Sequence, residues 1–109
     1  MSEFRRRALA LPETEEVPHH GSASFRVGGK IFAQLSGDDL SGLVKLPRPL
    51  QDLVIGEYPD GCRREAGRWG EAGWTRLDLS KIPADKAADL LETSWQMIAP
   101  ARLAVRHGR

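Results

Sequence analysis

The residues best equipped for chemistry in this sequence are arginine, lysine and tryptophan side chains within or beside short β-like runs. Alternation along these runs sends Arg26, Lys45, Trp74 and Arg76 to the face opposite the apolar core set. Guanidinium groups bind phosphates and indoles stack on bases, so a face of this composition can bind a nucleic acid. With the arginines of the adjoining strand and loop, the predicted nucleic-acid-binding set is Arg26, Lys45, Arg63, Arg64, Arg68, Trp74 and Arg76.

Two features of the sequence favour other interpretations of this face. Glu65, Glu71 and Asp78 are interleaved with the arginines, and such mixtures more commonly cover an ordinary solvated surface. The apolar residues at positions 31, 33 and 35 also alternate in phase with Arg26, which would make the face rather apolar. A register slip of one residue would exchange the two faces.

No cluster of residues in the sequence predicts catalysis or metal binding. Cys62 precedes two arginines whose charge would lower a thiol pKa, but no general base stands out to activate it. His19 and His20 point to opposite sides of an extended chain and are poorly placed to share one ion. The run Gly28-Gly29-Lys30 lacks the other residues of a phosphate-binding loop. We therefore expect a non-enzymatic protein without a metal or cofactor.

Length and composition indicate a single modest domain. The 109 residues include 16 basic and 15 acidic side chains, for a net charge of +1, so attraction to nucleic acid must come from a local patch. The single cysteine excludes an internal disulfide and is typical of a reducing compartment. No apolar run approaches the length of a membrane span, and none follows the early arginines as a secretory signal would. We expect a cytoplasmic protein that does not engage a membrane.

The elements that must position these side chains are organised around the stretch 24–35. Two runs rich in β-branched and aromatic residues flank Gly28-Gly29, and paired glycines tolerate the positive φ angles of a type I′ turn. This pattern predicts a tight β-hairpin whose facing phenylalanines begin the core. The cross-strand pairs expected of a two-residue turn are Val27–Lys30, Arg26–Ile31 and Phe25–Phe32.

Helices are predicted at both ends of the chain, with strands between them. Ser2 is expected to cap a helix that runs through Leu11, and a long helix follows Pro83. Strands are expected near 17–20, over 40–46, 62–66 and 74–79, with a short helix over 50–56 and a glycine-rich loop over 67–73. The residues expected to face the core are Leu40, Gly42, Val44 and Leu46 in one strand, Thr75, Leu77 and Leu79 in another, and Ala87, Leu91, Trp95 and Ile98 in the last helix.

This order predicts an α+β fold in which an antiparallel β-sheet carries the N- and C-terminal helices on one face. We expect residues 1–109 to form a single domain, with 100–109 as a basic C-terminal tail.

Several ordered pieces of the sequence resemble one known family. They are Leu-Pro-Glu at 11–13, Ser-Phe-Arg-Val-Gly-Gly-Lys-Ile-Phe-Ala at 24–33, Leu-Val-Lys-Leu at 43–46, Gly73-Trp74, and Leu-Leu-Glu-Thr-Ser-Trp at 90–95. Together they resemble the MmcQ/YjbR family over nearly the whole chain. The resemblance implies a fold similar to that of CyaY, the bacterial frataxin, and a family commonly labelled DNA-binding. It supplies no catalytic residue, and the three arginines of the first helix contrast with the acidic, iron-binding helix of frataxins.

We therefore expect a cytosolic, non-enzymatic binding protein of the MmcQ/YjbR type. Its expected partner is DNA, bound weakly through phosphate contacts by a monomer or weak homodimer. The alternative is a small protein-interaction or chaperone-like module that uses the apolar part of the open sheet face beside Trp69 and Trp74. Salt separates the two, because phosphate binding weakens steeply as salt rises and apolar docking does not.

Overall fold

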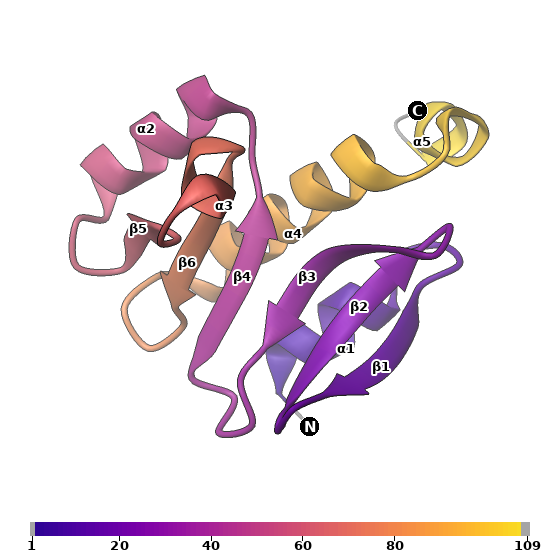
Figure 1. Ribbon diagram of the computed structural model, residues 1–109, viewed down its shortest axis with the longest axis horizontal. Helices are drawn as coiled ribbons and strands as arrows, with labels where there is room; N and C mark the ends of the chain where they lie inside the picture. The colour runs from indigo at the N-terminus through magenta and orange to yellow at the C-terminus, as the bar shows by residue number, and fades with distance from the viewer. Residues whose placement is uncertain (1, 108–109) are drawn as a thin grey trace.

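The computed structural model describes residues 2–107, which form a six-stranded antiparallel sheet whose first helix and longest helix pack against one face (Figure 1). The strands are β1 (Glu15–His19), β2 (Ser22–Val27), β3 (Lys30–Leu35), β4 (Ser41–Lys45), β5 (Cys62–Arg64) and β6 (Trp74–Asp78), in the sheet order β1-β2-β3-β4-β6-β5. The helices are α1 (Glu3–Leu9), α2 (Arg48–Glu57), α3 (Arg68–Glu71), α4 (Ala84–Ile98) and α5 (Ala101–His107). The predicted α+β class is confirmed. Most of the predicted 100–109 tail is α5, and its last two residues lie outside the described range.

The hairpin between β2 and β3 turns as predicted. Gly28 and Gly29 have φ angles of 60° and 79°, which a glycine pair adopts without steric cost. Arg26 pairs with Ile31 as expected, but Phe25 pairs with Ala33, because a β-bulge makes Phe32 an extra residue. The predicted Phe25–Phe32 pair is therefore wrong.

The bulge decides which side chains of β3 reach the core. Phe32 and Ala33 are both fully buried in the core cluster, and Leu35 follows them there. Ile31 remains on the face of Arg26. Regular alternation would place three apolar residues of β3 on the open face. The structure leaves only Ile31 there.

Helices α1 and α4 cover the core face of the sheet, behind the strands in Figure 1. The predicted cap is present, since the Ser2 hydroxyl oxygen accepts a hydrogen bond from the Arg5 backbone N–H at 3.1 Å. In α4 the predicted stripe is confirmed for Ala87, Leu91 and Trp95, and Ile98 is partly buried. The Trp95 indole N–H donates to the carbonyl of Pro12 at 3.1 Å, so the two ends of the chain are joined through the core.

Two predictions about the middle of the chain need correction. Leu40 is 57% exposed rather than buried, because β4 begins only at Ser41. The expected loop over 67–73 contains the short helix α3.

Strands β3 and β4 pair over only three residues each and then diverge (Figure 1). Ser94 of α4 is fully buried at the point of divergence. Its hydroxyl accepts a hydrogen bond from the Lys45 backbone N–H at 2.8 Å and donates one to the carbonyl of Phe32. Ser94 thus satisfies two backbone groups that the separated strands cannot pair. The sheet consequently has two halves, β1–β3 and β4-β6-β5, joined at one end.

Between residues 2 and 107, no helix has the length and apolar character that crossing a bilayer requires.

Candidate functional site

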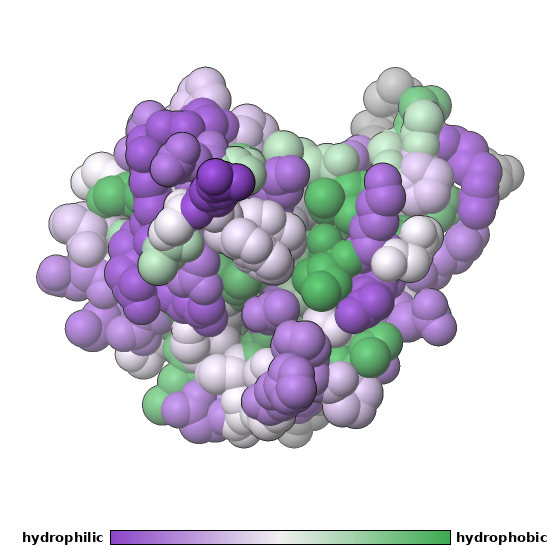
Figure 2. All heavy atoms as spheres, in the orientation of Figure 1, coloured by the Kyte–Doolittle hydropathy of each residue, from purple (hydrophilic) through white to green (hydrophobic). Residues whose placement is uncertain are grey.

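The open face of the sheet, opposite α1 and α4, carries most of the residues that the sequence singled out. Register places Lys45 beside Trp74 and Arg63 beside Arg76, all of them alternating with core residues. Arg26 lies on the same face in the other half, beside Ile31. Figure 2 views this face and shows hydrophilic groups on both halves, with hydrophobic atoms in the hollow between them.

Two of the predicted residues lie elsewhere. Arg64 alternates with Arg63 and leaves the opposite side of β5, where its guanidinium binds the carboxylate of Asp52 in α2 at 2.8 Å. The structure therefore does not bring Arg64 together with the other arginines of the set. Arg68 is exposed on α3, which packs against β6.

The exposed indole on this face is that of Trp69, not Trp74. The two rings pack against each other with centroids 4.9 Å apart and a tilt of 35°. Trp74 is only 9% exposed, whereas Trp69 is 46% exposed. Trp74 is therefore not the accessible indole that the sequence predicted, and Trp69 is accessible instead. Sequence alternation could not orient Trp69 because it lies in a predicted loop.

Helix α3 is held in place by a buried polar contact that the sequence did not indicate. The Gln51 side-chain amide of α2 is fully buried, and it donates to the carbonyls of Gly70 and Trp74, each at 3.1 Å, and to the Thr75 hydroxyl at 3.2 Å. Gly73 has a φ of 109°, and a Cβ there would lie 2.1 Å from the carbonyl oxygen of Leu46. This close packing fixes the position from which Trp69 reaches solvent.

The cations of the open face and of the adjoining helix α3 differ in how far their charge is already compensated. Arg76 is bound on one side by the carboxylate of Glu65 and donates to the Ser41 hydroxyl at 3.2 Å. Over residues 2–107, no hydrogen bond or ion pair involves the side chains of Lys45, Arg63 or Arg68. Arg26 also has no ion pair there, and its buried Nε has no hydrogen-bond partner. The site therefore offers four uncompensated positive charges.

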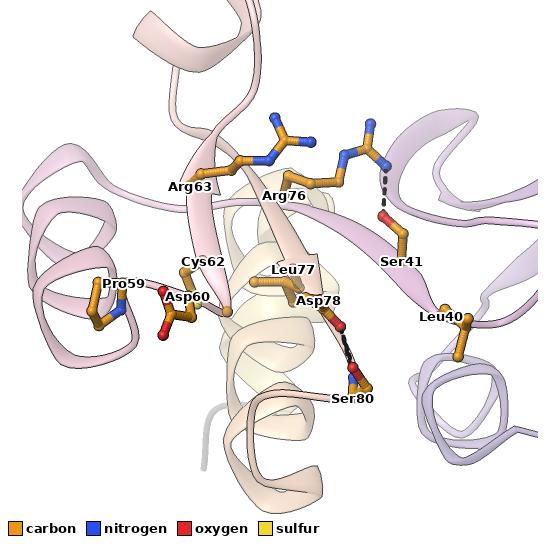
Figure 3. A pocket seen from close by; sticks show the side chains of 11 residues that line it. Leu40, Ser41, Pro59, Asp60, Cys62, Arg63, Arg76, Leu77, Asp78 and Ser80 are labelled. Carbon is orange, nitrogen blue, oxygen red and sulfur yellow. Dashed lines mark hydrogen bonds between the residues drawn. The ribbon is translucent and has the colours of Figure 1, made fainter.

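A pocket of about 330 Å³ opens where β4 begins and β6 ends (Figure 3). Arg63 and Arg76 extend side by side along one of its edges, and Asp78 and Ser80 lie at the opposite end. The Asp78 carboxylate accepts from the Ser80 hydroxyl at 2.6 Å and from the Ser80 backbone N–H at 3.0 Å. These two bonds, with the nearby charge of Lys81, hold the pKa of Asp78 below its usual value, so its carboxylate is ionised at neutral pH.

The remaining candidate groups have other surroundings than the sequence suggested. The Cys62 side chain is buried, and burial raises the pKa of its thiol instead of the lowering that its arginine neighbours suggested. His19 and His20 contact each other edge to face at the β1–β2 turn, with ring centroids 4.8 Å apart. In the described part of the chain, no three histidine, cysteine or acidic side chains gather closely enough to hold a metal ion.

Comparison with known proteins places this arrangement in a family. The YjbR family model matches residues 9–97. Among curated proteins, none matches the sequence. The crystal structure of Deinococcus radiodurans protein DR2400, which carries a DUF419 domain, is similar in fold, with a TM-score of 0.80 at 17% sequence identity over 96% of this chain and 85% of that chain. Because the matched residues span most of the sequence, this protein belongs to the YjbR family.

Proposed function

We propose that this YjbR domain is a non-enzymatic protein that binds DNA weakly, with little sequence preference, on the open face of its sheet. The observation that carries the proposal is the exposed indole of Trp69, packed on Trp74 and accompanied by the uncompensated cations Lys45, Arg63 and Arg68. An aromatic ring beside a basic track is the combination with which proteins bind single-stranded nucleic acids.

The arrangement favours single-stranded DNA over duplex. An indole stacks only on a base whose face is exposed, and bases in a duplex are already stacked on one another. The cations contact phosphates, which are identical for every sequence, so little base preference is expected. With about four such contacts and a net charge of +1, we expect an affinity of about micromolar or weaker at physiological salt.

The non-enzymatic part of the proposal has separate support. The thiol of Cys62 is buried and its raised pKa keeps it protonated, and Glu65 and Asp78, two carboxylates of the open face, are engaged in hydrogen bonds. The proposal therefore assigns binding roles to the open face and a catalytic role to no residue.

The neighbouring arginines of β5 provide the test. Fluorescence anisotropy of a labelled single-stranded oligothymidine, at low salt, compares Arg63→Gln with the matched control Arg64→Gln on the opposite face. We expect Arg63→Gln to weaken binding several-fold and Arg64→Gln to leave it unchanged. Trp69→Ala should weaken binding about 5- to 100-fold, which corresponds to the loss of one stacked base. No binding by the wild type at low salt, or equal losses for the two arginines, would contradict the proposal.

The alternative function, docking of a protein on an apolar sheet face, has less support. The bulge at Phe32 sends Ala33 and Leu35 to the core, and Leu43 on the open face is only 1% exposed. The hydrophobic surface visible in the hollow of Figure 2 is the feature that favours it. Binding of a protein partner that is insensitive to salt would identify this function.

A further inference from the structure

The pocket of Figure 3 lies between two opposite charges of β6 that turn away from each other. Arg76 and Asp78 are two residues apart, so both leave the open face of the strand. Arg76 extends toward Glu65 and Ser41, while Asp78 extends toward Ser80. Each charge has its own partners, and the space of about 330 Å³ between them stays open.

Arg63 adds an uncompensated positive charge to one edge of this space. It is the direct cross-strand neighbour of Arg76, and the two side chains extend alongside each other (Figure 3). Like charges opposite each other on adjacent strands repel. Glu65 compensates Arg76 only, so an anion that contacts both guanidinium groups would relieve the repulsion.

We propose that this pocket binds a small phosphomonoester. The phosphate contacts Arg63 and Arg76, and hydroxyl or amino groups on the body of the ligand donate to Asp78 and Ser80. The inference goes beyond the proposed function, because a DNA strand that crosses the open face need not enter the pocket. A strand carrying a terminal phosphate and a free phosphorylated molecule offer this same chemical group.

The choice of a phosphate follows from the pair of guanidinium groups. A terminal phosphate presents three oxygens and can accept bonds from two forked donors at once, whereas a carboxylate is matched by a single fork. The choice of one phosphate follows from the rest of the lining, where the carboxylates of Asp60 and Asp78 would repel a second phosphate. Lys81, at 3.8 Å from Asp78, compensates only part of this negative charge. The volume lies at the lower end of the range for small-molecule sites, and Leu40 and Pro59 provide its apolar sides.

Titration of the full chain with ribose 5-phosphate, followed by backbone amide NMR shifts, tests the inference. We expect shifts in 61–64 and 76–80 with ribose 5-phosphate but not with ribose, and weaker binding of fructose 1,6-bisphosphate. Arg63→Gln should weaken binding at least tenfold, and Arg64→Gln should have no effect. Asp78→Asn should raise the affinity for the bisphosphate relative to the monophosphate. Absence of shifts with ribose 5-phosphate, or equal losses for the two arginine variants, would overturn the proposal.

Two further experiments are needed. One distinguishes the two possible sources of the phosphate, and the other tests the DNA-binding proposal and the phosphomonoester proposal independently. An oligothymidine with a 5′-phosphate that binds more tightly than its 5′-hydroxyl form, with the difference lost in Arg63→Gln, identifies a strand end as the ligand. Equal binding of the two oligonucleotides identifies a free phosphorylated molecule. Trp69→Ala should reduce DNA binding and leave ribose 5-phosphate binding intact, so either proposal can fail while the other stands.

Discussion

Arg63 and Arg64 are neighbours of the same type, yet they belong to opposite faces of β5. Alternation turns Arg63 toward solvent beside Arg76, while Arg64 reaches Asp52 on α2. An exposed ion pair of this kind contributes little to stability, so neutralising either arginine should leave the fold intact. A comparison of Arg63 and Arg64 variants therefore separates the loss of a positive charge on the open face from the loss of a positive charge elsewhere on the protein.

Cys62, the residue before this pair, is predicted to be unreactive in the folded protein. Its thiol is buried, and the loss of solvation raises its pKa, an effect that Lys86 partly opposes. Because the thiolate is the reactive form, labelling by a disulfide reagent at pH 8 should be at least about 100-fold slower than in denaturant. The raised pKa also means that the folded state keeps its proton longer than the unfolded state, so stability should decline as pH rises above about 8.5. Rapid labelling of the native protein would contradict this assignment.

Elements with strong local signals were predictable from the sequence. The paired glycines define the β2–β3 turn, Ser2 caps α1, and the spacing of Leu91 and Trp95 reports the buried side of α4. The bulge at Phe32 was not predictable, because nothing in the strand's own sequence distinguishes it from regular alternation. The Phe32 carbonyl accepts a hydrogen bond from Ser94, on a helix distant in the sequence. Regular alternation therefore assigned Ala33 and Leu35 to the wrong face.

The candidate site shows the same division between local and distant causes. Alternation placed Arg26, Lys45 and Arg76 on the open face, since it needs only the strand and its core side chains. Exposure of Trp69 instead of Trp74 depends on α3, and α3 depends on the amide of Gln51 from another helix. The spacing of residues in the sequence does not indicate a contact such as that between the Gln51 amide and α3.

Ser94 shows how one helix shapes the sheet, and its removal should be costly. Ser94→Ala would leave the Lys45 N–H and the Phe32 carbonyl buried without a partner, at a cost of about 1–3 kcal/mol for each group. Urea denaturation measures this loss, and exchange of the Lys45 amide hydrogen should become faster. Thr93→Ala removes the neighbouring hydroxyl and is the matched control, with a smaller expected effect. Equal stabilities of the two variants would show that the hydroxyl of Ser94 does not bridge the strands.

Over the whole molecule, positive and negative side chains largely neutralise each other within neighbouring pairs. Acidic and basic side chains nearly cancel over the chain, and many of them neutralise each other in pairs such as Arg5–Glu16 and Lys86–Glu57. In the proposed function, the uncompensated cations of the open face therefore bind DNA without the help of a strong long-range field. Such a protein should associate with DNA only where phosphates come within a Debye length of that face.

The expected salt dependence of DNA binding follows from the number of uncompensated cations at the candidate site. Four uncompensated cations predict a slope of about −3 in a plot of log K against log salt concentration for single-stranded DNA. Arg63→Gln should make the slope shallower by about 0.7, because one phosphate contact is lost, and Arg64→Gln should not change it. Trp69→Ala should lower the affinity by a similar factor at every salt concentration, since stacking releases no counterions. Anisotropy titrations from about 25 to about 200 mM salt, a range of about one decade, measure all three slopes. A wild-type slope near zero would mean that phosphate contacts do not drive binding, and the hydrophobic hollow of the open face would then be the surface to map.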